Sequence, residues 1–115
     1  MINEILSALQ SGRPQDAERL CRAELAASPN NADLTLFLAI SLQQQGRLAE
    51  AVPLYAGLVE QHSDSAVHWG NYATALRSAG REQEASEAYA RALELEPDNV
   101  EQLTNLGLLQ IGQRD

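Results

Sequence analysis

The sequence predicts an all-α fold built from antiparallel helix pairs, and three observations carry that prediction. Aromatic residues make up only 4% of the 115 residues, while alanine and leucine are abundant, as in closely packed helices. Apolar residues recur three and four positions apart, as they do on one face of a helix. The dipeptide Gly-Arg begins at residues 12, 46 and 80, and such a constant interval, which we call the period, is typical of helical repeats.

The first helix pair is expected at residues 2–11 and 14–28. The two stretches are separated by Gly12-Arg13, and Pro14 comes directly afterwards. Proline suits the first turn of a helix, because its fixed φ is helical and its missing N–H has no partner there. The short first stretch therefore ends at Gly12, and the second helix starts at Pro14.

The second pair is expected at residues 31–45 and 48–62. Leucines at positions 34, 38 and 42 recur at helical spacing in the first of these stretches. Gly46 then ends the helix, because glycine adopts a left-handed backbone at little cost. Pro53 lies about one turn into the following helix, so we expect either a mild bend or a late helix start there.

The third pair is expected at residues 65–79 and 82–96, and a seventh helix at residues 99–111. The turn before the third pair reads Ser63-Asp64-Ser65, which is rich in residues that cap helices. Gly80-Arg81 separates the two helices of the pair. We expect the arginines of these turns to be solvated or paired with nearby acids such as Glu50 and Glu84.

Charge and cysteine content exclude several classes of function. The chain has a formal net charge of -8, and all eight of its basic residues are arginine. An acidic chain without a basic patch is a poor partner for nucleic acid or an anionic membrane. The single cysteine, Cys21, excludes an intramolecular disulfide. No secretion signal or stretch long enough to span a bilayer is evident, so we expect a cytoplasmic protein.

The best copy of the period resembles the tetratricopeptide repeat. This copy covers residues 66–99, and Tyr72-Ala73 stand where the family usually has Leu-Gly. The other positions at the family's spacing are Trp69, Leu76, Gly80, Ala85, Tyr89, Ala92 and Pro97. The copy at residues 32–65 matches less fully, since Thr35 replaces the tryptophan and Ser63 the proline. The resemblance implies a right-handed α-solenoid of antiparallel helix pairs, with about seven helices.

The resemblance extends over nearly the whole chain and defines its expected organisation. We expect one domain, residues 1–115, with a partial repeat at 1–31, full repeats at 32–65 and 66–99, and the first helix of a truncated repeat at 100–115. Ile5 stands where the family has a small residue, which suits an N-terminal cap. The apolar last helix suggests that the chain is the N-terminal part of a longer, bacterial protein.

No set of residues predicts an enzyme, a cofactor or a metal site. The Gly-Arg turns lack the further glycines and the Lys-Ser/Thr of a phosphate-binding loop. His62 and His68 flank one turn but have no clear third ligand, so we interpret them as surface residues. Cys21 occupies the repeat position of Tyr55 and Tyr89, and we expect all three to be packed in helix interiors. Trp69 and Tyr72 also match packing positions and are interpreted as core residues.

In the family, the first helix of each pair lines a concave groove that takes an extended peptide or a partner helix. Removing the packing positions leaves a candidate peptide-binding set on three such helices. This set consists of Asp33, Leu36, Phe37, Ile40, Gln44, Gly70, Asn71, Thr74, Arg77, Thr104, Asn105 and Leu108.

Two asparagines within this set, Asn71 and Asn105, are one period apart. A side-chain amide both donates and accepts, which matches a peptide unit. The pair resembles the asparagine ladder of some tetratricopeptide proteins, including the repeat region attached to O-linked N-acetylglucosamine transferases. Phe37 takes the equivalent place one period earlier, so the ladder would have two rungs. The alternative interpretation is that both asparagines are solvated helix residues.

Gly70 lies inside an expected helix, where glycine costs up to about 1 kcal/mol relative to alanine. We interpret it as allowing close approach of a neighbouring helix, with room for a ligand as the alternative. Without lysine, the chain cannot form the lysine-based carboxylate clamp of some family members, and only Arg77 offers a positive charge in the predicted groove.

The sequence therefore predicts a non-catalytic scaffold that binds a protein or peptide segment. Leu36, Phe37 and Ile40 would anchor apolar side chains, while Asn71 and Asn105 would bond to the peptide backbone. One alternative is self-association through the apolar last helix. Another is a targeting module for an enzyme whose catalytic domain lies beyond residue 115.

Overall fold

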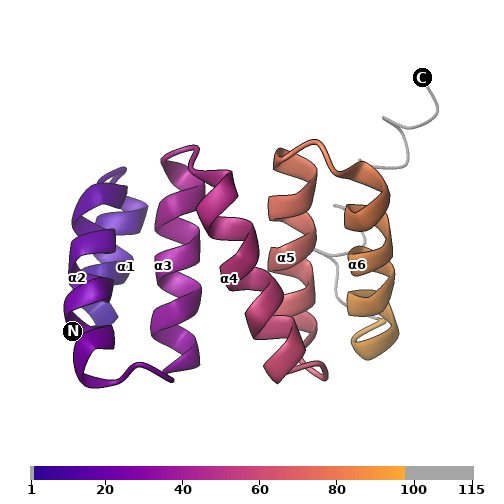
Figure 1. Ribbon diagram of the computed structural model, residues 1–115, viewed down its shortest axis with the longest axis horizontal. Coiled ribbons are helices and arrows are strands. Elements are labelled where there is room, and N and C mark those ends of the chain that lie inside the picture. Colours follow the sequence, from indigo (N-terminus) through magenta and orange to yellow (C-terminus); the bar gives the residue numbers. More distant parts are fainter. Residues whose placement is uncertain (1, 98–115) are drawn as a thin grey trace. The chain divides into compact units, whose positions relative to one another are not determined.

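The structure is a computed structural model that describes residues 2–97, and over this range it contains six helices (Figure 1). Their bounds agree with the predicted bounds to within about one residue. They are α1 (Ile2–Gln10), α2 (Pro14–Ala27), α3 (Ala32–Gln44), α4 (Leu48–Gln61), α5 (Ala66–Ser78) and α6 (Glu82–Leu95). The seventh helix expected at residues 99–111 lies outside the described residues.

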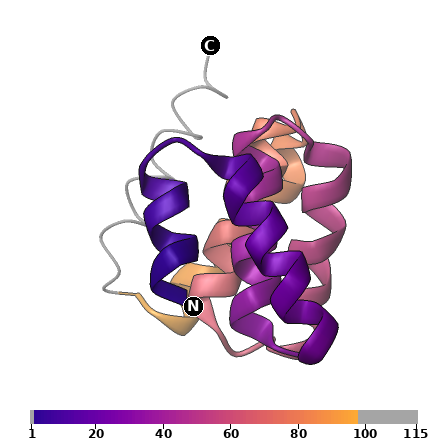
Figure 2. The same cartoon turned by 90° about the vertical axis from the view of Figure 1, so that its left-hand side faces the viewer.

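The chain divides into two compact units, Met1–Leu54 and Tyr55–Asp115, so α4 contributes its first half to one unit and its second half to the other. In the first unit, α2 packs against both α1 and α3, and α1 also contacts α3. Figure 2 shows α1 and α2 as neighbouring helices joined by one loop. In the second unit, α5 packs against α6.

The three Gly-Arg turns have the same backbone geometry, which confirms that they are helix corners. Gly12, Gly46 and Gly80 adopt φ of 72°, 77° and 80°, in the left-handed region that favours glycine. After each glycine, the arginine N–H donates to a carbonyl near the end of the preceding helix. These bonds are Arg13 to Ala8 (2.8 Å), Arg47 to Leu42 (2.9 Å) and Arg81 to Leu76 (2.9 Å). Each helix carbonyl is thereby satisfied by the returning chain.

Ion pairs at the same turns repeat with the same period. Each turn arginine meets an acid in the first turn of the next helix: Arg13 with Asp16 at 3.8 Å, Arg47 with Glu50 at 2.6 Å, and Arg81 with Glu84 at 2.6 Å. The predicted pairing with Glu50 and Glu84 is therefore confirmed.

Side chains at the capping positions explain where α3 and α5 begin. The Asn31 side chain accepts a hydrogen bond from the Leu34 N–H at 3.1 Å, and the Ser65 hydroxyl accepts one from the His68 N–H at 3.3 Å. Each cap satisfies a backbone N–H that has no partner within its helix. In α4, Pro53 lies inside a helix that already begins at Leu48, so a late helix start is wrong.

The core follows the repeat positions that the sequence singled out, with two exceptions. Cys21, Tyr55 and Tyr89 are fully buried, as predicted. Trp69 and Tyr72, by contrast, are only half-buried. These two rings line a pocket beside α6, so they form a wall of that pocket as well as part of the packing.

Candidate binding surfaces

The predicted face of α3 carries apolar side chains that its unit does not fully bury. Leu36, Phe37 and Ile40 are half-buried, and Asp33 and Gln44 at the ends of this face are exposed. The opposite side of α3 holds the buried Leu34, Leu38 and Leu42. The helix therefore divides into a core side and a second, accessible apolar side.

The accessible apolar surface continues on α1, which the sequence interpretation had not included. Ile2 is 40% exposed and Leu6 is half-buried. They precede Leu36 and Ile40 by one period, and α1 contacts α3. Counting back from α3 would have found them. We call Ile2, Leu6, Leu36, Phe37 and Ile40 the apolar face of the first unit.

The predicted face of α5 is more polar. Asn71, Thr74 and Arg77 are half-buried, and Gly70 is buried. The Thr74 hydroxyl lies 3.0 Å from the Gly70 carbonyl, to which it donates, and 2.9 Å from the Tyr89 hydroxyl. Thr74 thus joins α5 to α6, so its hydroxyl is partly used within the unit.

The Asn71 side chain forms no hydrogen bond with another residue in the range 2–97, so its amide group is available to a ligand. Its expected counterpart Asn105 lies outside the described residues, as do Thr104 and Leu108. Of the two predicted rungs of an asparagine ladder, the structure therefore describes one.

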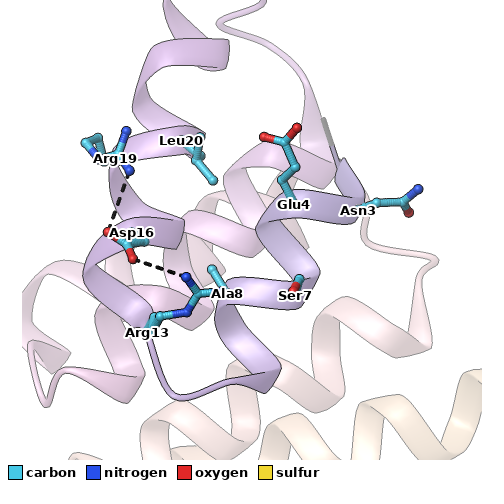
Figure 3. Close-up of a pocket in the computed structure, with 8 residues that line it drawn as sticks. All are labelled: Asn3, Glu4, Ser7, Ala8, Arg13, Asp16, Arg19 and Leu20. Carbon is cyan, nitrogen blue, oxygen red and sulfur yellow. Dashed lines mark ion pairs between the residues drawn. The ribbon is translucent and has the colours of Figure 1, made fainter.

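A polar pocket of about 430 Å³ lies on α1, α2 and the turn between them (Figure 3). Its lining residues are Asn3, Glu4, Ser7, Ala8, Arg13, Asp16, Arg19 and Leu20. The Asp16 carboxylate lies between two guanidinium groups, at 3.8 Å from Arg13 and 3.6 Å from Arg19. Opposite charges of similar number make this pocket close to neutral.

A second pocket, of about 420 Å³, lies between α5 and α6. Its lining residues are Trp69, Tyr72, Leu76, Glu84, Glu87, Ala88 and Arg91. The centroids of the Trp69 and Tyr72 rings are 6.2 Å apart, and the ring planes are tilted by 50°. We call it the aromatic pocket, because these two rings distinguish it from the pocket on α1 and α2.

A polar network connects α2 to the turn between α3 and α4. The half-buried Glu18 carboxylate accepts hydrogen bonds from Gln45 at 3.0 Å, Arg47 at 2.8 Å and Arg22 at 2.9 Å. The Gln45 bond, together with the two arginines, holds the pKa of Glu18 below its ordinary value. Arg47 also reaches Glu50 at 2.6 Å, and that bond lowers the pKa of Glu50.

The described residues give little support for metal or thiol chemistry. Over residues 2–97, no group of three or more His, Cys, Asp or Glu side chains is placed to hold a metal ion. The ring centroids of His62 and His68 are 5.5 Å apart, so the two rings contact each other. Burial raises the pKa of the Cys21 thiol to about 11, which leaves it protonated and unreactive at neutral pH.

Within the described part of the chain, every helix is too short or too polar to cross a membrane.

Solved structures share this fold at low sequence identity. A chain of the Naa15/Naa10 complex bound to HypK-THB is 26% identical, with a TM-score of 0.82; the alignment covers 98% of our chain and 17% of that chain. The first tetratricopeptide domain of Spaghetti (RPAP3), bound to the HSP90 peptide SRMEEVD, is 20% identical with a TM-score of 0.87, covering 98% and 92%. An O-GlcNAc transferase mutant from Thermobaculum terrenum is 24% identical with a TM-score of 0.85, covering 91% and 20%.

No curated protein matches the sequence. The chain spans less than a fifth of the Naa15/Naa10 chain and a fifth of the transferase. At these identities, the structural likeness to the RPAP3 domain and the transferase concerns the fold, and it confirms the predicted all-α solenoid class.

A sequence model described as tetratricopeptide repeat matches residues 8–70, which is more than half of the chain. The matched range includes the turns at Gly12 and Gly46, whose geometry is the same in the structure. The Gly-Arg period, the helix pairs and the matched sequence agree, and the chain belongs to the tetratricopeptide repeat family.

Proposed function

We propose that this chain is a non-catalytic interaction module that binds a segment of a partner protein. The observation that carries the proposal is the apolar face of the first unit. Five aliphatic or aromatic side chains there remain accessible on two contacting helices. Apolar side chains grouped at helical spacing on a surface mark a place where a partner's apolar side chains dock.

The polar residues of α5 would supply a different kind of contact. Asn71 offers both a donor and an acceptor, which is what an extended peptide backbone requires. It would hold the main chain, whereas Phe37 and its neighbours would take side chains. Arg77 adds one positive charge on the same helix.

The related structures agree with this kind of function. The RPAP3 domain, which has the same fold over 98% of our chain, is described in complex with an HSP90 peptide. That peptide carries acidic residues, whereas the predicted binding set of our chain offers a single cation, Arg77. We therefore infer a partner segment that depends on apolar anchors more than on acidic groups.

The test uses peptides selected from a random display library on the immobilised chain. Binding of a selected peptide is measured by fluorescence anisotropy for wild type and Phe37→Ala. We expect the dissociation constant to rise about tenfold, because a central anchor contributes more than about 1 kcal/mol to binding. Gln15→Ala, at an exposed position of α2 outside this face, is the matched control and should bind as wild type does.

Asn71→Ala combined with Asn105→Ala tests the polar part of the proposal. The double variant should weaken peptide binding while leaving the melting temperature nearly unchanged. An unchanged affinity would refute the ladder but leave the apolar face to be judged on the Phe37 result. Equal binding by wild type and Phe37→Ala would contradict the proposal as a whole.

The two alternative functions depend on regions that the structure does not describe. Self-association would use residues 99–111, and sedimentation at several concentrations would detect it. A role in targeting an enzyme concerns sequence beyond residue 115. Both stay predictions.

A further inference from the structure

The aromatic pocket between α5 and α6 presents the faces of two aromatic rings, those of Trp69 and Tyr72. The Trp69 indole N–H donates to the Ser63 carbonyl at 2.8 Å, which fixes the ring. The Tyr72 ring lies beside it, tilted by 50°, and Leu76 and Ala88 complete the apolar part of the lining. Such an angled pair of rings can enclose a flat or chain-like side chain.

The same pocket has an acidic edge formed by α6. Glu84 is held by Arg81 at 2.6 Å, and the pocket's own arginine, Arg91, is held by Glu94 at 2.9 Å. Among residues 2–97, Glu87 forms no ion pair. The edge therefore carries one uncompensated negative charge next to the two rings.

We propose that this pocket binds an arginine side chain of a partner protein. The electron-rich faces of Trp69 and Tyr72 attract a cation, and tryptophan does so most strongly. A guanidinium group is planar and stacks on aromatic rings while its N–H groups reach a carboxylate, here that of Glu87. A volume of about 420 Å³ falls in the range of ordinary ligand sites.

This site is separate from the peptide-binding surface proposed above. Trp69, Tyr72 and Leu76 lie on one side of α5, and Asn71 and Thr74 occupy another, since successive helix residues turn by about 100°. The first helix pair lacks an equivalent of this site. The residues two periods earlier that correspond to Tyr72 and Glu87 are Glu4 and Arg19, which suit a cation less well.

The chain offers its own probe, because Trp69 is the single tryptophan among its 115 residues. Nα-acetyl-arginine amide is titrated into the full chain, and the NMR signal of the indole N–H and the tryptophan fluorescence are followed. We expect a saturable shift at constant ionic strength. Nα-acetyl-citrulline amide has nearly the same shape without the charge, and it should bind at least about fivefold more weakly, given the usual size of a cation–ring contact.

Two variants separate the acidic edge from a general charge effect. Glu87→Gln should weaken arginine binding about fivefold, because it removes the uncompensated charge. Glu82→Gln removes the same charge from the same helix at a position outside the pocket, and it should bind as wild type does. Circular dichroism should show unchanged helix content in both variants, since both positions are exposed.

Three results would overturn the proposal. Equal binding of the arginine and citrulline compounds would show an apolar pocket without charge selectivity. No saturable response would exclude arginine as the occupant. A tryptophan signal that changes with protein concentration alone would assign the pocket to a second copy of the chain. None of these outcomes bears on Phe37 or Asn71, so the peptide-binding proposal is tested independently.

Discussion

The α1/α2 pair and the α5/α6 pair are built on the same skeleton, two periods apart in the sequence. Gly12 and Gly80 both have a positive φ, at 72° and 80°. Ala17 and Ala85, which follow at the same distance, are both completely buried. A small side chain at that point lets the two helices of a pair approach closely, and the glycine lets the chain reverse.

The linings of the two pockets differ at the positions that this skeleton leaves free. Glu4 and Ala8 on α1 correspond to Tyr72 and Leu76 on α5. The first pair therefore has a pocket lined by charged side chains whose net charge is close to zero. The third pair has a pocket lined by two aromatic rings. The repeat constrains the corners and the closest contacts, whereas each pair acquires its surface chemistry separately.

The largest effect should come from a core position that the two pairs fill differently. Cys21 and Tyr89 are equivalent, and each is completely buried. Tyr89→Ala should lower the free energy of unfolding by about 3–5 kcal/mol, because it empties a ring-sized volume. Cys21→Ala should cost about 1 kcal/mol, since it removes one sulfur atom. Urea denaturation followed by circular dichroism measures both.

Tyr89→Phe isolates the hydroxyl that lies 2.9 Å from Thr74. It keeps the ring and should cost about 1 kcal/mol, the usual net value of one hydrogen bond. If Cys21→Ala lowers the free energy of unfolding as much as Tyr89→Ala does, the first helix pair depends on this core position as strongly as the third. That result would contradict the difference expected between the two pairs.

Because Gly12 and Gly80 have the same turn geometry, alanine substitutions at the two positions should have equal effects on stability. At both Gly12 and Gly80 an added Cβ would meet no atom within 4 Å, so only the left-handed backbone opposes alanine. Each Gly→Ala change should cost about 1–2 kcal/mol. Gly57, with open space and an ordinary helical backbone inside α4, is the matched control, and Gly57→Ala should stabilise by up to about 1 kcal/mol. Clearly unequal costs at Gly12 and Gly80 would show that the two corners are not equivalent.

Structural features that recur with the period were predicted from the sequence, whereas features that occur only once were missed. Six helices were located to within about one residue, because glycine corners and apolar spacing recur in each pair. The half-burial of Trp69 was not predicted, because its position in the repeat indicates a packed core residue. The pocket beside it is formed together with α6 side chains, which the spacing along the chain does not reveal. The bond between Thr74 and Tyr89 links two helices, and no spacing along the chain encodes such a pair. Ile2 and Leu6, in contrast, could have been found by counting one period back from α3.

The network around Glu18 is a feature of the first unit that α6 lacks, because Ser86 occupies the equivalent position. Glu18→Gln should lower the free energy of unfolding at neutral pH by about 1 kcal/mol. This is less than a fully buried hydrogen bond to a charged group would contribute, because solvent reaches the arginines. Ser86→Ala is the matched control and should have no effect that depends on pH.

The sign of the pH dependence follows from the lowered pKa of Glu18. A carboxyl whose pKa is lower in the folded state stabilises fully above its pKa in the unfolded chain and loses that contribution as the pH falls through the folded value. Wild type and Glu18→Gln should therefore differ at pH 7 and converge toward pH 3 in urea denaturation. A difference that persists at pH 3 would assign the effect to packing rather than to charge.

The smallest expected effect concerns the ion pairs of the pocket on α1 and α2. Asp16 lies between Arg13 and Arg19 at 3.8 and 3.6 Å, and its side chain is 44% exposed. Ion pairs that water reaches so easily contribute little, so Asp16→Asn should change the free energy of unfolding by less than about 0.5 kcal/mol. Added sodium chloride should remove even this difference, which urea denaturation at low and high salt would measure. A loss above about 1 kcal/mol would show that the charges hold α1 against α2. The charged side chains of the polar pocket would then help to hold their helix pair together, as Trp69 and Tyr72 do in the third pair. Their charges would contribute to stability as well as to the surface.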